Sequence, residues 1–168
     1  MARPKKILFV CTGNTCRSSM AEGIARHLLG DDREIRVLSA GVHALPNVPA
    51  TPEAVEALAE EGIDISGHRA ALLTRELVEE ADLVLTMTAG HRRLVREAAP
   101  DQAGKVFTLA EYAGAGGDVS DPLGQPLHVY RRYAAELRRL IRLALERFRE
   151  EAGRVEGNRS SAVEDGKS

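Results

Sequence analysis

Tryptophan is absent from the 168-residue sequence, and aromatic residues make up only 4% of it. Single-stranded nucleic acids are usually held by bases stacked on aromatic side chains, so this scarcity argues against such a ligand. The formal net charge is −2, which provides no general attraction to nucleic acids or to acidic membranes. We therefore expect no nucleic-acid partner.

Long apolar segments are also missing. No run approaches the roughly 20 residues that a membrane-spanning helix needs, and the apolar run after Lys5 and Lys6 is too short for a signal peptide. The only two cysteines, Cys11 and Cys16, lie in one short stretch, so they do not form a disulfide framework. We therefore expect a cytoplasmic protein that does not associate with membranes.

Clusters of metal-binding residues are a third absence. No group of histidine, cysteine and acidic residues has the spacing of a metal site. His91 and His128 stand alone in the sequence, and we expect both side chains to be solvated. The sequence therefore predicts neither a metal nor another cofactor.

The composition is that of one globular domain, with 29% charged and 43% hydrophobic residues. We place this domain at residues 1–151 and expect it to be monomeric. Residues 152–168 are rich in Gly, Ser, Asn and mixed charge, with almost no large apolar residue. This composition predicts a disordered tail.

Strand and helix patterns alternate along the domain. Apolar or alternating runs predict strands at residues 7–10, 34–38, 82–87 and 105–108. Amphipathic patterns predict helices at residues 20–29, 51–62, 74–78, 91–99 and 127–149. This order predicts an α/β fold with three layers, in which helices cover both faces of a four-stranded parallel sheet and a phosphate-binding loop follows the first strand.

Residues 10–18 join the first strand to the first helix with the sequence Val-Cys-Thr-Gly-Asn-Thr-Cys-Arg-Ser. A strand, a tight loop and a helix N-terminus form an anion site, because backbone N–H groups and the helix dipole point at the ligand. Gly13 lets the loop turn tightly, and the planar fork of Arg17 suits two phosphate oxygens. The sequence predicts that a phosphate is held by a cradle made of Thr12, Gly13, Asn14, Thr15, Cys16, Arg17 and Ser18.

Cys11 would place a thiol beneath that phosphate. A helix N-terminus and a nearby arginine favour the thiolate form of a cysteine, which is its nucleophilic form. Ser18 could hydrogen-bond the sulfur and help it leave later. A lone cysteine is more often a small buried hydrophobic residue, but Gly13, Arg17 and Ser18 at these spacings favour a nucleophile.

The string from Cys11 to Ser18, its place after the first strand and the later Asp121-Pro122 pair resemble the low-molecular-weight protein tyrosine phosphatase family over about residues 5–150. The resemblance implies a cysteinyl-phosphate enzyme acting on phosphorylated proteins, with Cys11 as the nucleophile and Arg17 as the transition-state clamp. One departure is Ser19, where the family commonly has proline. Since Ser19 lies outside the cradle, we expect a small effect on stability only.

The same resemblance implies roles for supporting residues. Asn14 would lock the cradle through its side-chain amide, and Ser39 and His68 match its usual partners. Cys16 would form a reversible disulfide with Cys11, which would protect the nucleophile from irreversible oxidation. A buried, inert thiol is an equally open reading of Cys16.

Residues 114–124 form a long, glycine-rich loop that contains Asp121-Pro122. Asp-Pro alone is an ordinary turn dipeptide. The family resemblance makes Asp121 the general acid that protonates the leaving atom and then the base that activates water. Asp118 is the nearest rival, and we expect it to cap or order the loop instead.

Thr15 bears on the substrate, because tyrosine-directed members of the family typically have a larger aliphatic residue there. Residues 11–18, together with Gly117-Asp118-Val119-x-Asp121-Pro122, resemble the bacterial protein-arginine phosphatase branch. The resemblance implies hydrolysis of phosphoarginine in proteins, with Thr15 as the specificity residue. A tyrosine phosphatase is the alternative.

Two further classes of protein stay open at this point. Thioredoxin-coupled arsenate reductases share this loop but need additional cysteines, which the chain lacks. A non-catalytic phosphate-binding module would not need all three of Cys11, Arg17 and Asp121.

Overall fold

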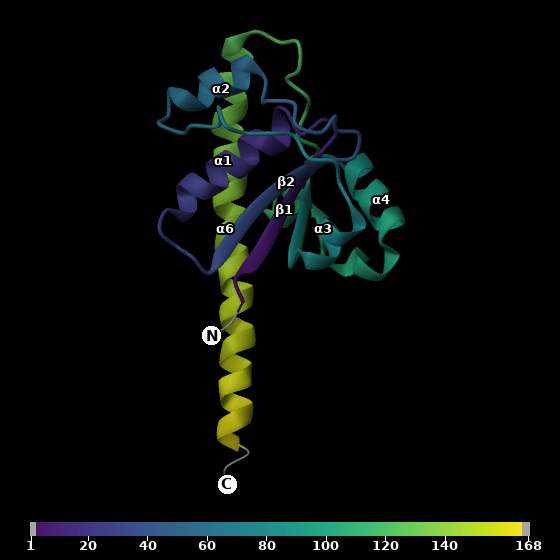
Figure 1. The fold of residues 1–168 in the computed structure, drawn as a ribbon. Helices are drawn as coiled ribbons and strands as arrows, with labels where there is room; N and C mark the ends of the chain where they lie inside the picture. The colour runs from purple at the N-terminus through teal and green to yellow at the C-terminus, as the bar shows by residue number, and fades with distance from the viewer. Residues whose placement is uncertain (1–2, 166–168) are drawn as a thin grey trace.

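The computed structural model describes residues 3–165 (Figure 1). Along the chain, the elements are β1 (Lys5–Cys11), α1 (Arg17–Leu29), β2 (Ile35–Gly41), α2 (Pro52–Ala59), α3 (Arg75–Glu80), β3 (Leu83–Thr86), α4 (Ala89–Ala98), the 3₁₀ helix η1 (Pro100–Lys105), β4 (Val106–Thr108), α5 (Leu109–Tyr112) and α6 (Leu127–Asp165). The predicted alternation of strands and helices is confirmed. The sequence patterns did not predict α5 or η1.

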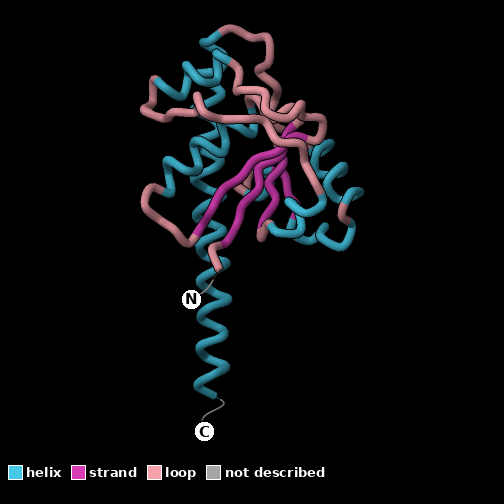
Figure 2. The backbone as a smooth tube through the Cα atoms, viewed as in Figure 1, coloured by secondary structure: helices cyan, strands magenta, loops and turns pink. Residues whose placement is uncertain are grey.

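The four strands form one parallel sheet in the order β2-β1-β3-β4 (Figure 2). β1 pairs with β2 on one side, Cys11 lying opposite Gly41, and with β3 on the other. The chain therefore leaves β1 toward one neighbour and later returns to the other. Ligands of open parallel sheets bind at such a switch point, beyond the carboxyl ends of the strands.

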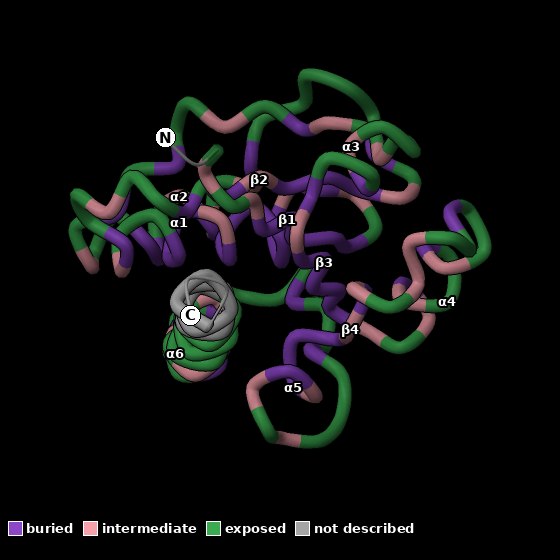
Figure 3. Tube along the Cα trace, turned by 90° about the horizontal axis from the view of Figure 1, so that it is seen from below, coloured by how far each residue is buried: buried purple, intermediate pink, exposed green. Residues whose placement is uncertain are grey.

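Helices cover both faces of the sheet, as predicted (Figure 3). Ile7 and Phe9 of β1 face the larger core, which contains residues of α1, α2, α5 and α6. Leu8 and Val10 face the smaller core, which contains Val78 of α3 and Val95 of α4. Because both faces of β1 are packed, the strand reads in the sequence as a continuous apolar run.

Threonine side chains define where three of the helices begin. Thr74, Thr88 and Thr108 precede α3, α4 and α5, and each side chain accepts a backbone N–H from the first turn of its helix. Glu111 completes a capping box with Thr108. This cap stabilises α5, which at four residues is too short to show helical periodicity in the sequence.

The last helix is longer than predicted. α6 packs against α1 and α2 and continues to Asp165, where the composition predicts a disordered tail from residue 152. Ala, Glu and Arg are good helix formers, and they extend the helix beyond Phe148, its last buried side chain among the described residues. The helix therefore replaces the predicted tail over residues 152–165, while residues 166–168 lie outside the described residues.

Within the part of the chain that the structure describes, no helix is both long enough and apolar enough to cross a membrane.

Candidate active site

The loop that joins β1 to α1 lies at the switch point of the sheet. Its backbone is hydrogen-bonded to the segments that follow the two neighbouring strands, β2 and β3. The carbonyls of Cys11 and Thr12 accept from the N–H groups of Val42 and His43, which follow β2, and Met87, which follows β3, donates to the carbonyl of Val10. These bonds fix the start of the loop at the carboxyl edge of the sheet.

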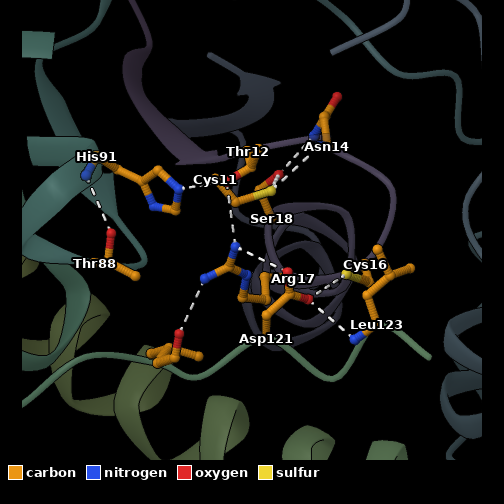
Figure 4. A network of polar contacts seen from close by, with 11 residues as sticks. Cys11, Thr12, Asn14, Cys16, Arg17, Ser18, Thr88, His91, Asp121 and Leu123 are labelled. Atoms are coloured by element: carbon orange, nitrogen blue, oxygen red, sulfur yellow. Dashed lines mark hydrogen bonds and ion pairs between the residues drawn. The ribbon is translucent and has the colours of Figure 1, made fainter. Parts of the chain in front are cut away.

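Cys11 ends β1 with its side chain buried inside the loop (Figure 4). Its Sγ lies 2.9 Å from Ser18 Oγ and accepts from the backbone N–H of Asn14 at 3.3 Å. Ser18 Oγ in turn accepts from Asn14 Nδ2 at 2.7 Å. With that acceptor position occupied, the Ser18 hydroxyl can donate its proton to the sulfur, so two donors point at Cys11 Sγ.

Asn14 holds the loop in shape. It is fully buried and adopts a left-handed backbone with φ of 58°. Gly13, the residue predicted to let the loop turn tightly, does not adopt a positive φ. Asparagine tolerates this region better than most residues, because its short polar side chain can hydrogen-bond locally.

The residues expected to support Asn14 lie around it. Asn14 Nδ2 donates to Ser39 Oγ at 2.9 Å, and Asn14 Oδ1 accepts from the backbone N–H of Ala71 at 2.9 Å. His68 Nε2 donates to the backbone carbonyl of Asn14 at 2.7 Å, while its Nδ1 faces Glu22 at 3.7 Å. The structure therefore brings Ser39 and His68 together with the cradle.

Replacing Asn14 with alanine is expected to lower the free energy of unfolding by about 3 kcal/mol. The substitution removes the side-chain hydrogen bonds to Ser18, Ser39 and the Ala71 amide, and it leaves the buried Ser39 hydroxyl and the half-buried Ala71 amide without these partners. Chemical denaturation measures the loss. Asn47→Ala is the control, since Asn47 is also left-handed, with φ of 69°, but is exposed. Equal losses in both variants would contradict the role of the network.

Arg17 opens α1, and its side chain is only 6% exposed. Nη1 donates to the carbonyl of Val119 at 3.2 Å, and Nη2 donates to Thr12 Oγ1 and Asp121 Oδ2, each at 3.4 Å. The third nitrogen, Nε, is buried and has no hydrogen-bond partner within the described residues. A buried donor without a partner is costly, and an anion seated over Cys11 would supply one.

Asp121 also reaches this site. Its carboxylate contacts the Arg17 guanidinium, although the two residues are 104 positions apart in the chain. Its Oδ1 accepts from the Leu123 N–H at 3.0 Å and from Cys16 Sγ at 3.6 Å. The carboxylate is 44% exposed, so it can exchange protons with a ligand or with water. The Asp-Pro pair thus forms a local turn and also reaches the cradle.

Asp118 does not share this position. Its Oδ1 accepts from the backbone N–H of Ala89, the first residue of α4, at 2.9 Å. The next residue, Val119, donates its N–H to the carbonyl of Met87. The prediction that Asp118 orders the loop is confirmed by these contacts, which anchor the loop to the end of β3.

Cys16 and Ser19 stabilise the start of α1. Burial, the nearby Asp121 carboxylate and Cys11 raise the pKa of the Cys16 thiol to about 12, so this side chain stays protonated. Both cysteines are free thiols. Ser19 Oγ donates to the Cys16 carbonyl at 3.0 Å, a bond that a proline at this position could not make.

Thr15 is half-buried, and its carbonyl accepts from the N–H of Thr51.

Two residues of the site were missed by sequence reasoning. The prediction that His91 is solvated is wrong, because its side chain is buried and its Nε2 lies 2.8 Å from Thr12 Oγ1. The sequence signal for its burial was its position on α4, four residues before the buried Val95. Gly41 is the second, since a Cβ there would lie 2.4 Å from the Thr12 carbonyl oxygen. Nothing in the sequence marks Gly41 as a point of close backbone approach.

Comparison with known proteins connects this arrangement to a family. Residues 6–154 match the model of the low molecular weight phosphotyrosine protein phosphatases. The protein-arginine-phosphatase of Bacillus subtilis (strain 168) is 48% identical over 140 residues, which cover 81% of this chain and 91% of that protein. The crystal structure of a low molecular weight protein tyrosine phosphatase from T. tengcongensis has a TM-score of 0.82 and 49% identity, covering 84% of this chain and 98% of that one.

A second similar structure is a mutant of the YwlE arginine phosphatase with a phosphorylated active site serine. Its TM-score is 0.80 at 44% identity, and the match covers 86% of this chain and 95% of that one.

Proposed function

Because this chain belongs to the low molecular weight phosphotyrosine protein phosphatase family, we propose that it hydrolyses phosphoarginine in proteins through a cysteinyl-phosphate intermediate. The observation that carries the proposal is that the Asp121 carboxylate, 104 residues away in the chain, meets the Arg17 guanidinium at the loop that also holds Cys11 Sγ. The 48% identity to a protein-arginine-phosphatase supports the choice of substrate.

In the first step, the Cys11 thiolate attacks phosphorus, an S–P bond forms and the P–N bond of phosphoarginine breaks. The Ser18 hydroxyl and the Asn14 N–H stabilise the thiolate by donating to it. Asp121 protonates the departing guanidino nitrogen. The phosphorylated active-site serine of the YwlE mutant is in keeping with a covalent phosphoenzyme in a similar protein.

In the second step, water attacks the cysteinyl phosphate. Asp121 is now ionised and takes a proton from that water, the S–P bond breaks, and inorganic phosphate leaves with the Cys11 thiolate restored. The Ser18 hydroxyl stabilises the sulfur as it departs.

Arg17 stabilises the negative charge that builds up on the phosphoryl oxygens in both steps. The Nε–H that lacks a partner and one Nη2–H form the fork that binds two of these oxygens. For this to happen, the Nη2 contact to Asp121 gives way to the phosphoryl group. The same exchange frees the Asp121 carboxyl to act on the leaving group.

Thr15 selects phosphoarginine over phosphotyrosine. Its side chain is smaller than the aliphatic residues that this position holds in tyrosine-directed relatives, and its hydroxyl can hold the attacking water. Asp121 pairs with the guanidinium group before it donates the proton. The alternative substrate is phosphotyrosine, which the family description and the name of the T. tengcongensis protein support.

The test compares kcat/KM for a phosphoarginine peptide and a phosphotyrosine peptide of the same sequence. We expect phosphoarginine to be preferred by at least about tenfold, and Thr15→Ile to reverse much of this preference. Thr15→Ser, which keeps the hydroxyl and the small volume, is the matched control. A wild-type preference for phosphotyrosine would keep the mechanism and overturn the role given to Thr15.

Asp121→Asn is expected to lower kcat/KM, which reports the step that releases the leaving group, by about 10²- to 10⁴-fold on phosphoarginine. The loss should be much smaller on p-nitrophenyl phosphate, whose leaving group needs little protonation. Asp118→Asn is the matched control, because an asparagine still accepts the Ala89 N–H at the start of α4. Steady-state kinetics on both substrates measure the effect. Equal losses in the two variants, or equal losses on both substrates, would argue against Asp121 as the acid.

We further propose that the protein acts in the cytoplasm as a monomer, without metal or cofactor, on phosphorylated proteins. We also retain the redox role of the two cysteines. A peroxide would oxidise the Cys11 thiolate to a sulfenic acid, and the Cys16 thiol would then form the disulfide with release of water.

A further inference from the structure

His91 is a buried titratable residue to which the proposed reaction gives no role. It lies in the first turn of α4, with its backbone N–H bonded to Thr88 Oγ1 at 3.1 Å. Its ring points away from the helix toward the cradle, where Nε2 lies 2.8 Å from Thr12 Oγ1 (Figure 4). Thr12 Oγ1 also accepts from Arg17 Nη2 at 3.4 Å. A continuous path of polar contacts therefore runs from α4 to the guanidinium group.

The donors along this path can be assigned by counting hydrogens. His91 Nδ1 is buried and has no hydrogen-bond partner within the described residues. If Nδ1 carried the proton, a buried N–H would be orphaned, and such groups are rare in proteins. With the proton on Nε2, the unpaired atom is only an acceptor. We therefore assign His91 Nε2 as a donor to Thr12 Oγ1.

The imidazole ring is neutral in this setting. Burial and the nearby positive charge of Arg17 lower the pKa of His91 to about 4, although Asp118 and Asp121 act in the opposite direction. A neutral ring can lie close to Arg17 without repelling it. It also keeps its hydrogen bond to Thr12 at neutral pH.

Thr12 needs such a partner because it lies on the exposed side of the loop. A free threonine hydroxyl can turn among several rotamers. The bond from His91 fixes its oxygen with one acceptor position occupied and the other available to Arg17. Thr12 Oγ1 accepts from Nη2, and the Val119 carbonyl accepts from Nη1. These two bonds fix the edge of the guanidinium group that faces away from the proposed phosphoryl site.

We propose that His91 is a positioning residue that holds the Thr12 hydroxyl so that Thr12 orients the Arg17 guanidinium for bidentate contact with the phosphoryl group. The inference rests on the proposed phosphatase function, because it concerns how Arg17 stabilises the transition state. His91 itself touches neither the substrate nor the reacting atoms.

Two amide variants separate this role from a structural one. The side-chain nitrogen of glutamine reaches the place of imidazole Nε2, whereas that of asparagine reaches only the place of Nδ1. His91→Gln should therefore keep the donor to Thr12 and stay within about threefold of the wild-type kcat on p-nitrophenyl phosphate. His91→Asn should lose about tenfold in kcat, with KM changed less than about twofold. His128→Asn, on the exposed first turn of α6, is the control for the substitution itself.

Two further measurements make the result decisive. Thr12→Val should lose about as much as His91→Asn, and the double variant should lose no more than either single one, because both break the same path. Orthovanadate, which mimics the transition state, should bind the His91→Asn variant about tenfold more weakly by calorimetry. Vanadate binding does not need turnover, so it tests the role of His91 independently of hydrolysis. If the wild-type protein hydrolysed none of the phosphate substrates, that result would contradict the proposed function but not the role of His91.

Several results would overturn the proposal. These are wild-type kcat and vanadate affinity in His91→Asn, equal losses in the Gln and Asn variants, and additive losses of Thr12→Val and His91→Asn. Thermal unfolding of each variant supplies the remaining control. A fall in melting temperature without a change in kcat or vanadate affinity would show that His91 serves only to stabilise the fold.

Discussion

Cys11→Ser is expected to reduce turnover of phosphoarginine by at least about 10⁴-fold. The serine hydroxyl is a far weaker nucleophile than a thiolate, while its size suits the same buried position at the end of β1. The fold should therefore survive, as a thermal melt would show. The loss should appear in kcat on phosphoarginine, phosphotyrosine and aryl phosphates alike, because all of them need the same nucleophile.

Cys16→Ser is the matched control for this prediction. A serine there still donates to Asp121 and keeps its backbone amide in the cradle. Under reducing conditions we expect this variant to lose less than about tenfold. If Cys11→Ser matched the wild type in cellular function, the protein would be better described as a phosphate-binding module than as an enzyme. Equal losses of turnover in the two variants would contradict the assignment of Cys11 as the nucleophile.

Arg17→Lys is expected to lower kcat/KM by about 10³-fold. Lysine keeps the positive charge but not the planar fork, and it has no counterpart to the Nε–H that stands buried without a partner. It also gives up the bond from Nη1 to the Val119 carbonyl, which links the cradle to the loop that carries Asp121. Most of the loss should fall on kcat, because the fork acts on charge that develops in the transition state.

Arg26→Lys provides the control, since Arg26 lies on the same helix with a side chain that is 62% exposed. It should retain kcat/KM within about twofold. Titration with inorganic phosphate by calorimetry gives a second readout. If Arg17→Lys retained wild-type kcat/KM, the clamp assigned to Arg17 would be wrong.

The loop from Cys11 to Ser18 could be predicted because the residues that form the anion site are neighbours in the sequence. A strand, a short loop and a helix start are all visible in neighbouring residues, and parallel sheets place ligands at the ends of strands. Asp121 required the family resemblance, since 104 residues separate it from Arg17 and Asp-Pro by itself indicates only a turn. The turn is present as well, through the Leu123 N–H.

His91 shows what the sequence does not reveal. The residue is 79 positions from Thr12, and their contact exists only because β3 lies beside β1 and α4 begins just after β3. An isolated histidine among charged residues resembles a solvated one until the packing of α4 is known. Gly41 is a similar case. A side chain at this position of β2 would collide with the backbone of the loop that follows β1, and the residues around Gly41 in the sequence do not reveal that contact.

The C-terminal part of α6 differs from its prediction for another reason. Composition without large apolar residues indicates only that a segment has little to bury. Residues 152–165 satisfy that condition and still continue a helix that residues 127–151 begin. Helix propagation adds a hydrogen bond for each residue fixed, so a helix can extend past the core that nucleates it.

The phosphoenzyme itself is the measurement that tests the central claim most directly. A phosphoarginine peptide is mixed with the wild-type protein and with Asp121→Asn, the reaction is quenched in acid within one turnover, and the modified residue is located by mass spectrometry. We predict a phosphoryl group on Cys11 in both proteins. In Asp121→Asn it should form more slowly, because the acid is missing, and last longer once formed, because hydrolysis of the intermediate is slowed. Release of phosphate at the full rate with no phosphoryl group on Cys11 at any time, or with the group on another residue, would contradict the account.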